Sequence, residues 1–261
     1  MSLTFILLAL GSGLAAGVLA GLFGVGGGTL VVPMLMVQGA GIHQAVPLSL
    51  VYILFTSLSG SLVYWRQGLL EVRTVLLMSL SAILTIFAGV HLNQSFSQSQ
   101  LAWLFAAFMV LILSMFAWKE KQNLAVVRPV ATGRKRWLYV IFTGLLAGLI
   151  ASLLGVGGGL IMVPLLILLC GEDLRQATGT SLAAVFLIAI IGLVQHTLFG
   201  QLASALGHFG INLLLMSIAG MAGAPLGVWL NRKLPDKLLR LGFISLCLAV
   251  MGYMVWKANG Q

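Results

Sequence analysis

The chain has 261 residues, of which 60% are hydrophobic and 7% are charged, and its mean hydropathy is +1.11. Soluble globular domains carry about 25% charged residues, so the composition excludes a soluble protein and predicts an integral membrane protein. The net charge of +9 does not indicate binding to nucleic acid, because the basic residues lie in short loops beside apolar segments, where they report membrane orientation.

Apolar stretches long enough to cross a bilayer as helices recur along the chain. Those that contain no Lys, Arg, Asp or Glu are Leu3–Phe23, Val75–His91, Leu101–Trp118, Leu138–Leu154 and Leu241–Trp256. The alternation of period two that marks a transmembrane barrel is absent, so α-helices must satisfy the backbone in lipid. The sequence therefore predicts an all-α, polytopic membrane protein.

The first apolar stretch ends in a glycine-rich interruption that occurs again in the second half. GLFGVGGGTLVVPML begins at Gly21, and SLLGVGGGLIMVPLL begins 131 residues later at Ser152. After a one-residue insertion the likeness continues, so that GAGIHQAVPLSL (39–50) matches GEDLRQATGTSL (171–182) and Tyr64 matches His196. We expect two copies of one unit: transmembrane repeats at 1–118 and 137–261, joined by a basic linker at 119–136.

Each repeat is expected to hold a glycine-broken helical hairpin followed by about three transmembrane helices. The linker is strongly basic, which places it in the cytoplasm; its charged residues are Lys119, Glu120, Lys121, Arg128, Arg134, Lys135 and Arg136. The basic loops at 65–73 and 231–240 then fall on the same side, and the uncharged loops at 93–100 and 200–207 fall outside.

This agreement requires each glycine-centred pair of arms to enter and leave on one face, either as two full crossings or as a re-entrant hairpin. The two repeats are then inverted relative to each other. The second arms, about 29–38 and 160–170, cover only half of the hydrocarbon thickness at about 1.5 Å per residue. Their length favours a re-entrant hairpin with its tip near the midplane.

A helix that begins directly after three glycines favours binding of an anion. Its first N–H groups have no partner within the helix, its dipole is positive there, and glycine leaves the backbone open to close approach. The glycines expected to bind substrate are Gly24, Gly26, Gly27, Gly28, Gly155, Gly157, Gly158 and Gly159. Close helix packing is the alternative, and it is the interpretation for Gly17, Gly21, Gly144 and Gly148. A nucleotide loop is disfavoured, because no Lys-Ser/Thr pair follows either glycine run.

Polar residues near the predicted breaks are further candidates for substrate binding. They are Thr29, Gln44, Ser49, Gln176, Thr180 and Ser181. The alternative for the hydroxyls is a hydrogen bond to their own helix, and the alternative for the glutamines is a helix cap or an interhelical bond.

No acidic residue lies deep in an apolar segment, which weakens the case for proton or sodium coupling through a carboxylate. His196 is the best titratable candidate for proton coupling, with a hydrogen-bonded histidine near a helix end as the alternative. Arg175, beside Glu172 and Asp173, is either an attractor for anions or part of a loop salt bridge. Neither a nucleophile–base set nor a metal motif such as His-Glu-x-x-His is present, so we expect no enzyme and no cofactor or metal.

The two Gly-x-Gly-Gly-Gly runs with their following prolines, together with the Gln-Ala-x3-Ser-Leu frames, resemble the TauE/SafE family of sulfite exporters over essentially the whole chain. The resemblance implies a secondary transporter of small sulfur-containing anions such as sulfite, thiosulfate or organosulfonates; we expect an exporter, with import as the alternative. It also implies a multi-pass protein of the bacterial cytoplasmic (inner) membrane. A transporter of another small anion, such as a carboxylate, is the alternative. The expected partners are a small anionic substrate and the lipid bilayer, without nucleic acid. A homo-oligomer is possible, because packing glycines can serve contacts within one chain or between chains.

Overall fold

The structure is a computed structural model that describes residues 3–122 and 133–259. Within these ranges the chain forms helices and no strand. In these two ranges, eight helices are long and apolar enough to cross a membrane, and two shorter apolar helices, at 28–37 and 159–170, follow the glycine runs. The predicted all-α, polytopic class is confirmed.

The two halves contain the same succession of helices. The first half comprises α1 (Leu3–Phe23), α2 (Gly28–Val37), α3 (Ile42–Arg66), α4 (Val72–Ser95) and α5 (Gln98–Gln122). The second comprises α6 (Gly133–Leu154), α7 (Gly159–Leu165) with its π-helical continuation η1 (Leu166–Cys170), α8 (Leu174–Leu198), α9 (Gln201–Lys233) and α10 (Asp236–Asn259). Each half thus has the expected long arm, short arm and three further long helices.

Some predicted loops are shorter than expected. Helices α5 and α6 extend into the predicted linker at 119–136, and residues 123–132 of that linker lie outside the described residues. The predicted loop at 200–207 is reduced to the turn at Phe199 and Gly200, because Gly200 takes a left-handed conformation with φ 72° and α9 begins at the next residue.

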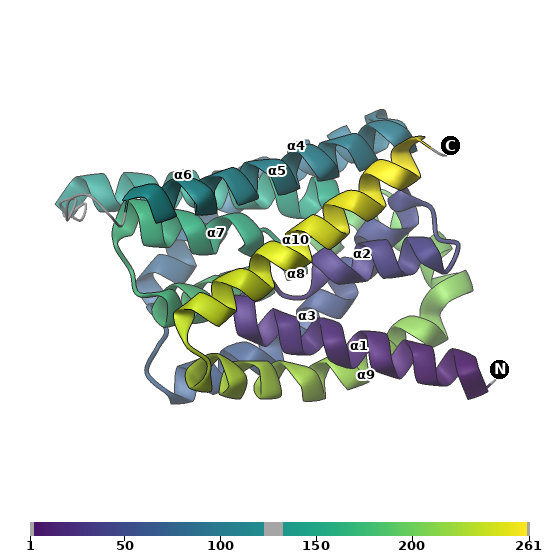
Figure 1. Ribbon diagram of the computed structural model, residues 1–261. Coiled ribbons are helices and arrows are strands. Elements are labelled where there is room, and N and C mark those ends of the chain that lie inside the picture. The colour runs from purple at the N-terminus through teal and green to yellow at the C-terminus, as the bar shows by residue number, and fades with distance from the viewer. Residues whose placement is uncertain (1–2, 123–132, 260–261) are drawn as a thin grey trace.

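Long helices from opposite halves pack together in matching pairs. Helix α1 lies along α9 and α6 lies along α4, while α3 packs against α8 and α5 against α10. Exchanging α1–α5 with α6–α10 maps this set of pairs onto itself. Helices α1 and α6 begin at opposite ends of the bundle (Figure 1). The pairing agrees with inverted repeats, although the inversion of the whole unit and the division into 1–118 and 137–261 stay predictions.

Glycines bring the paired helices close together. A methyl carbon placed on Gly17 would lie 2.7 Å from the Cα atom of Gly220, and one placed on Gly144 would lie 2.8 Å from the Cα atom of Met78. Real Cβ atoms essentially never come this close, so the packing interpretation of Gly17 and Gly144 is confirmed.

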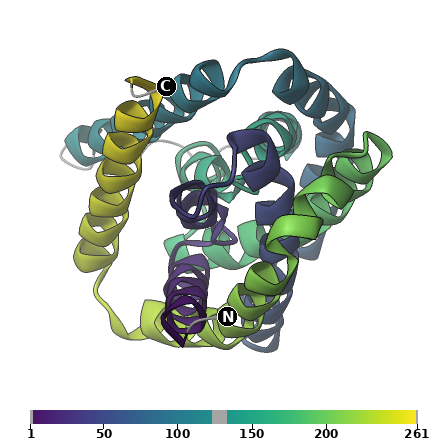
Figure 2. The same cartoon turned by 90° about the vertical axis from the view of Figure 1, so that its right-hand side faces the viewer.

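The two ends of the bundle differ in charge. One end, which we call the basic end, holds the α3–α4 loop, the start of α6 and the α9–α10 loop. The other end, the terminal end, holds both chain termini (Figure 1). Seen from the terminal end, the short arms lie inside a ring of longer helices (Figure 2). The glycine breaks are therefore enclosed by the bundle.

Candidate functional site

The glycine runs end one helix and begin the next through left-handed residues. The φ angles are 72°, 70° and 86° at Gly24, Gly26 and Gly27, and 70°, 77° and 75° at Gly155, Gly157 and Gly158. Residues with a side chain rarely adopt this conformation, so glycine is required at each of these positions. All six glycines are buried.

The two breaks lie directly against each other. A methyl carbon placed on Gly28 would clash with the carbonyl oxygen of Gly155, and one placed on Gly159 would clash with the carbonyl oxygen of Gly24. Each short arm therefore begins against the last turn of the opposite long arm. The side chains of Ile53 from α3 and Val185 from α8 cover both breaks; a methyl carbon on Gly26 would lie 2.8 Å from Val185 and 2.9 Å from Ile53. In this conformation the glycines are closed off.

The second hairpin begins and ends at the basic end. Arg136, in the first turn of α6, contacts Glu172, which lies just after η1, at 3.1 Å. The first short arm, α2, has only 10 residues and spans about 15 Å at 1.5 Å per residue. The shortness of α2 favours a re-entrant hairpin over a pair of full crossings, whereas a start and an end on one side fit both arrangements.

Ending a helix inside a membrane frees backbone carbonyls that need hydrogen-bond donors. At the end of α1 the donors are side chains. Tyr64 donates to the Gly21 carbonyl at 3.0 Å, Asn231 to the Leu22 carbonyl at 2.6 Å, and Ser181 to the Gly24 carbonyl at 3.0 Å.

The end of α6 repeats the same arrangement. His196 Nε2 lies 3.3 Å from the Ser152 carbonyl, Asn93 donates to the Leu153 carbonyl at 2.8 Å, and Ser49 donates to the Gly155 carbonyl at 2.7 Å. Four of these six side chains come from the half of the chain opposite to the break: Ser49, Asn93, Ser181 and Asn231. The capping bonds thus tie the two halves together.

The N–H groups at the breaks are left without acceptors. In the described part of the chain, the N–H groups of 26–28 and of 157–159 form no hydrogen bond, although the Gly27 carbonyl accepts from Leu30 and Val31. The Thr29 hydroxyl is also buried and has no partner there. A cluster of buried donors that carry no protein acceptor, next to the N-terminus of a helix, is suited to an anion.

The other predicted site residues lie in three places. Ser49 and Ser181 cap the opposite break, as described above. Gln44 accepts a bond from the Gly41 N–H at 3.3 Å and so caps the start of α3. The Thr180 hydroxyl accepts from the Glu71 N–H at 3.3 Å at the basic end. Gln176 is also at the basic end, where it lines a polar cavity of about 470 Å³ with Leu69, Asp173, Leu174 and Arg175.

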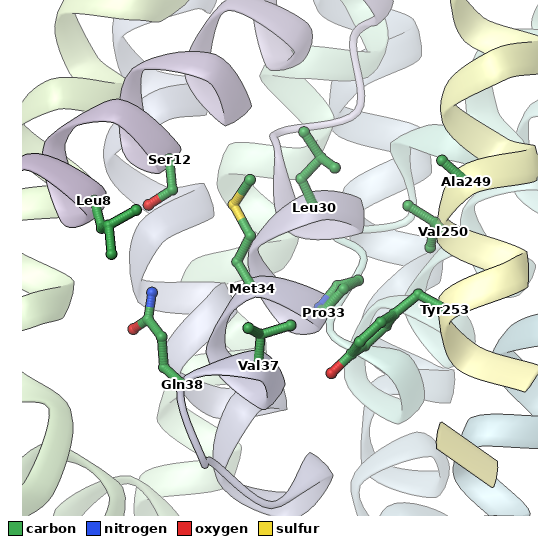
Figure 3. A pocket seen from close by; sticks show the side chains of 10 residues that line it. All are labelled: Leu8, Ser12, Leu30, Pro33, Met34, Val37, Gln38, Ala249, Val250 and Tyr253. Atoms are coloured by element: carbon green, nitrogen blue, oxygen red, sulfur yellow. The ribbon is translucent and has the colours of Figure 1, made fainter. Parts of the chain in front are cut away.

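A second cavity, of about 380 Å³, lies between α1, α2 and α10 (Figure 3). Its wall is mostly apolar, with Leu30, Pro33 and Met34 contributed by α2, and its few polar side chains include Ser12 and Gln38. This cavity runs beside the short arm and does not include the glycines.

Several residues of the site were not found by reasoning from the sequence. Asn93 and Asn231 fill equivalent roles but are separated by 138 residues, whereas Ser49 and Ser181 are separated by 132. Alignment of the two repeats at one constant offset therefore does not pair the two asparagines. Ile53 and Val185 share the 132-residue offset, but as ordinary apolar residues they carry no chemical signal.

In the described part of the chain, two buried, broken hairpins lie among six further long apolar helices, an arrangement typical of a multi-pass membrane transporter. The profile of the family described as "Sulfite exporter TauE/SafE" matches residues 9–254, and the chain belongs to this family.

Curated relatives agree with this class. The chain is 27% identical to the probable membrane transporter protein YunE of Bacillus subtilis (strain 168), over 86% of this chain and 88% of the relative. It is 30% identical to the probable membrane transporter protein YjnA of the same organism, over 85% and 88%, and 25% identical to the probable membrane transporter protein MJ0441 of Methanocaldococcus jannaschii, over 92% and 91%. No solved structure gives a significant match. The protein is a membrane transporter.

Proposed function

We propose that this protein is a secondary transporter that exports small sulfur-containing anions such as sulfite, thiosulfate or organosulfonates. The observation that carries the proposal is the set of buried N–H groups without acceptors at the two breaks, beside the unpartnered hydroxyl of Thr29. The name of the family supports sulfite or a related oxyanion. A small carboxylate is the second candidate, because backbone amides recognise charge and oxygen geometry without regard to the central atom.

The anion is bound near the middle of the bundle, between the opposed N-termini of α2 and α7. Because Ile53 and Val185 cover the glycines, an anion reaches the N–H groups only when the two breaks move apart. Movement of one half against the other opens the site to one side of the membrane at a time, as in other transporters with broken helices.

The basic end faces the cytoplasm of a bacterial inner membrane, following the excess of Lys and Arg in its loops. A monoanion that leaves the cell down a potential of about 100 mV, inside negative, gains about 2.3 kcal/mol. This term favours export.

The proposal is tested with purified protein in liposomes, by comparing uptake of radiolabelled sulfite, thiosulfate, a C2 sulfonate and acetate. The informative variant is Thr29→Val, which keeps the side-chain shape and breaks no hydrogen bond within the described protein. A hydrogen bond to a charged group is worth about 1.5–3 kcal/mol, so we expect KM to rise about tenfold or more in a fully folded protein.

Ser217→Ala is the matched control, because it removes another buried hydroxyl that has no partner in the described structure. Its KM should stay at the wild-type value. Uptake of acetate without uptake of any sulfur anion would exclude the proposed substrate class, and an unchanged KM in Thr29→Val would place the anion elsewhere.

A further inference from the structure

Three charged side chains form a cluster at the basic end. The Arg136 guanidinium binds both carboxylate oxygens of Glu71, with 3.0 Å between Nη1 and Oε1, and its Nη2 also donates to Oε1 of Glu172 at 3.1 Å. Two carboxylates therefore converge on one guanidinium nitrogen.

The cluster joins the second hairpin to the first half of the chain. Glu71 ends the α3–α4 loop, Arg136 lies in the first turn of α6, and Glu172 lies between η1 and α8, directly after the short arm. Movement of the short arm away from α4 must pull Glu172 away from the other two. The cluster is thus placed to hold the basic end closed.

Glu172 is the most deeply buried member. Its side chain is 4% exposed, against 24% for Glu71 and for Arg136, and its Oε2 atom has no partner in the described structure. The loss of solvent raises the pKa of Glu172 to about 7; the hydrogen bond from Arg136 opposes this rise, and the negative charge of Glu71 adds to it.

Other charged groups nearby are already engaged or face outward. Arg73 of α4 stacks on the Trp137 ring at 4.3 Å. Asp173 and Arg175, at the start of α8, are exposed, and Arg175 donates to the Arg232 carbonyl at 3.2 Å. Cys170 of η1 is a buried free thiol. Arg136 is therefore the cation that Glu71 and Glu172 share.

The sequence does not repeat these three charged residues at the matching positions of the other repeat. The positions that match Arg136 and Glu172 in the other repeat are Phe5 and Ala40. Glu71 matches Ala203 at the 132-residue offset of Ser49 and Ser181, and Phe209 at the 138-residue offset of Asn93 and Asn231. Among the described residues the capping bonds at the breaks occur in both halves, whereas this titratable contact occurs once. The cluster therefore makes the two ends different, and a coupling ion that binds it affects only the basic end.

We propose that Glu172 is the proton-binding residue of this transporter, and that release of its proton accompanies opening of the basic end. The inference rests on the proposed function as a transporter. In the closed arrangement the buried carboxyl holds the proton and Arg136 compensates the charge of Glu71. When the basic end opens, water reaches Glu172, its proton passes to solvent, and the carboxylate stays solvated. Because the closed form binds the proton more tightly, acid favours the closed form.

The first test is titration of protein labelled with ¹³C at the glutamate carboxyl groups, in lipid nanodiscs. The chain contains three glutamates, Glu71, Glu120 and Glu172, so each signal can be assigned with a single Glu→Gln variant. We expect the Glu172 signal to titrate near pH 7 and to shift toward its ordinary range, near 4.5, in Glu71→Gln. Titration of Glu172 below about pH 5 in the wild type, as for an unperturbed carboxyl group, would overturn the proposal.

The second test measures opening directly, by thiol labelling of Leu174→Cys in a background with Cys170→Ala and Cys247→Ala. Leu174 lines the polar cavity at the basic end. The rate of thiol labelling should rise severalfold more between about pH 6 and pH 8 in the protein with Glu172 than in Glu172→Gln. Glutamine imitates the protonated residue, so the basic end of this variant should stay closed. The pH dependence of the thiol itself is the same in both proteins, so it cancels in the ratio of their labelling rates.

Equal pH dependence in the two proteins would overturn the link between proton release and opening. Neither readout uses a sulfur anion. If uptake of sulfur anions fails while the titration and the labelling behave as expected, only the substrate class is wrong. Elution as a single species and an unchanged melting temperature at pH 5 establish that Glu172→Gln is folded.

Discussion

The close contact between the two breaks gives a sharp prediction for Gly28→Ala and Gly159→Ala. Both residues begin a short arm with ordinary helical φ angles, so alanine introduces no backbone strain there. What it introduces is a methyl group against the opposite break. For Gly159 this methyl carbon would lie 2.7 Å from the Cα atom of Val25, where ordinary contact begins at 3.4 Å. To restore ordinary contact, the two breaks must move apart by the difference between these two distances.

The size of the effect follows from that separation. Overpacking of a rigid interior costs about 1–3 kcal/mol, and the neighbour here is backbone, which has no rotamer to change. Separation also weakens the 2.7 Å bond from Ser49 to the Gly155 carbonyl, worth about 1 kcal/mol. We therefore expect each alanine to lower the free energy of unfolding by about 2–4 kcal/mol relative to Gly11→Ala. Gly11 is a helical control whose methyl group would meet no atom within 4 Å.

The double variant distinguishes this explanation from two local defects. Each methyl group pushes the same two segments apart, so the second acts on a contact already loosened by the first. The double variant should lose less stability than the sum of the two single losses, by about 1 kcal/mol or more. The free energy of unfolding is measured by steric trapping in lipid discs. A Gly28→Ala protein as stable as Gly11→Ala, or strict additivity in the double variant, would refute the contact.

Three further predictions concern the capping bonds and the charged cluster. Asn93→Ala and Asn231→Ala should each lower the free energy of unfolding by about 1–2 kcal/mol, because each leaves an equivalent buried carbonyl without its donor; unchanged stability of either variant in steric trapping would contradict its capping role. His196→Gln keeps a donor but cannot titrate, so the pH profile of uptake should be unchanged, whereas a lost pH response would assign proton coupling to His196. The raised pKa of Glu172 adds stability that is complete below its ordinary pKa of 4.5 and is lost as the pH rises through about 7, so the melting temperature should fall over this range in the wild type and less in Glu172→Gln.

The breaks themselves could be predicted from the sequence, because they depend on a local property. Three glycines after an apolar run destabilise the continuation of the helix. A short apolar segment that ends near a proline is too short to span the bilayer. The repetition of this pattern after 131 residues also predicted that both halves share one order of helices.

The partners of the freed carbonyls could not be predicted, because they depend on packing between halves. A buried asparagine on α4 or α9 has the same local sequence signal as one that caps its own helix. Likewise, Glu172 lies beside Arg175 in the sequence, which made a loop salt bridge the natural alternative. In the structure Glu172 pairs with Arg136, 36 positions away, and its side chain is buried, neither of which the sequence indicates.

The distribution of these bonds constrains how the transporter can move. Tyr64 and His196 cap breaks in their own half, and these bonds can persist when the halves shift. The bonds from the other four capping side chains cross between halves, so a rigid movement of one half must stretch or exchange them. Since the crossing bonds are matched at the two breaks, they resist opening toward either end to a similar degree. If Glu172 is the proton-binding residue, the Glu71–Arg136–Glu172 cluster adds resistance at the basic end only, and the strength of this contact changes near neutral pH. Three side chains would then give a protein built from two similar halves a pH-dependent difference between its two openings.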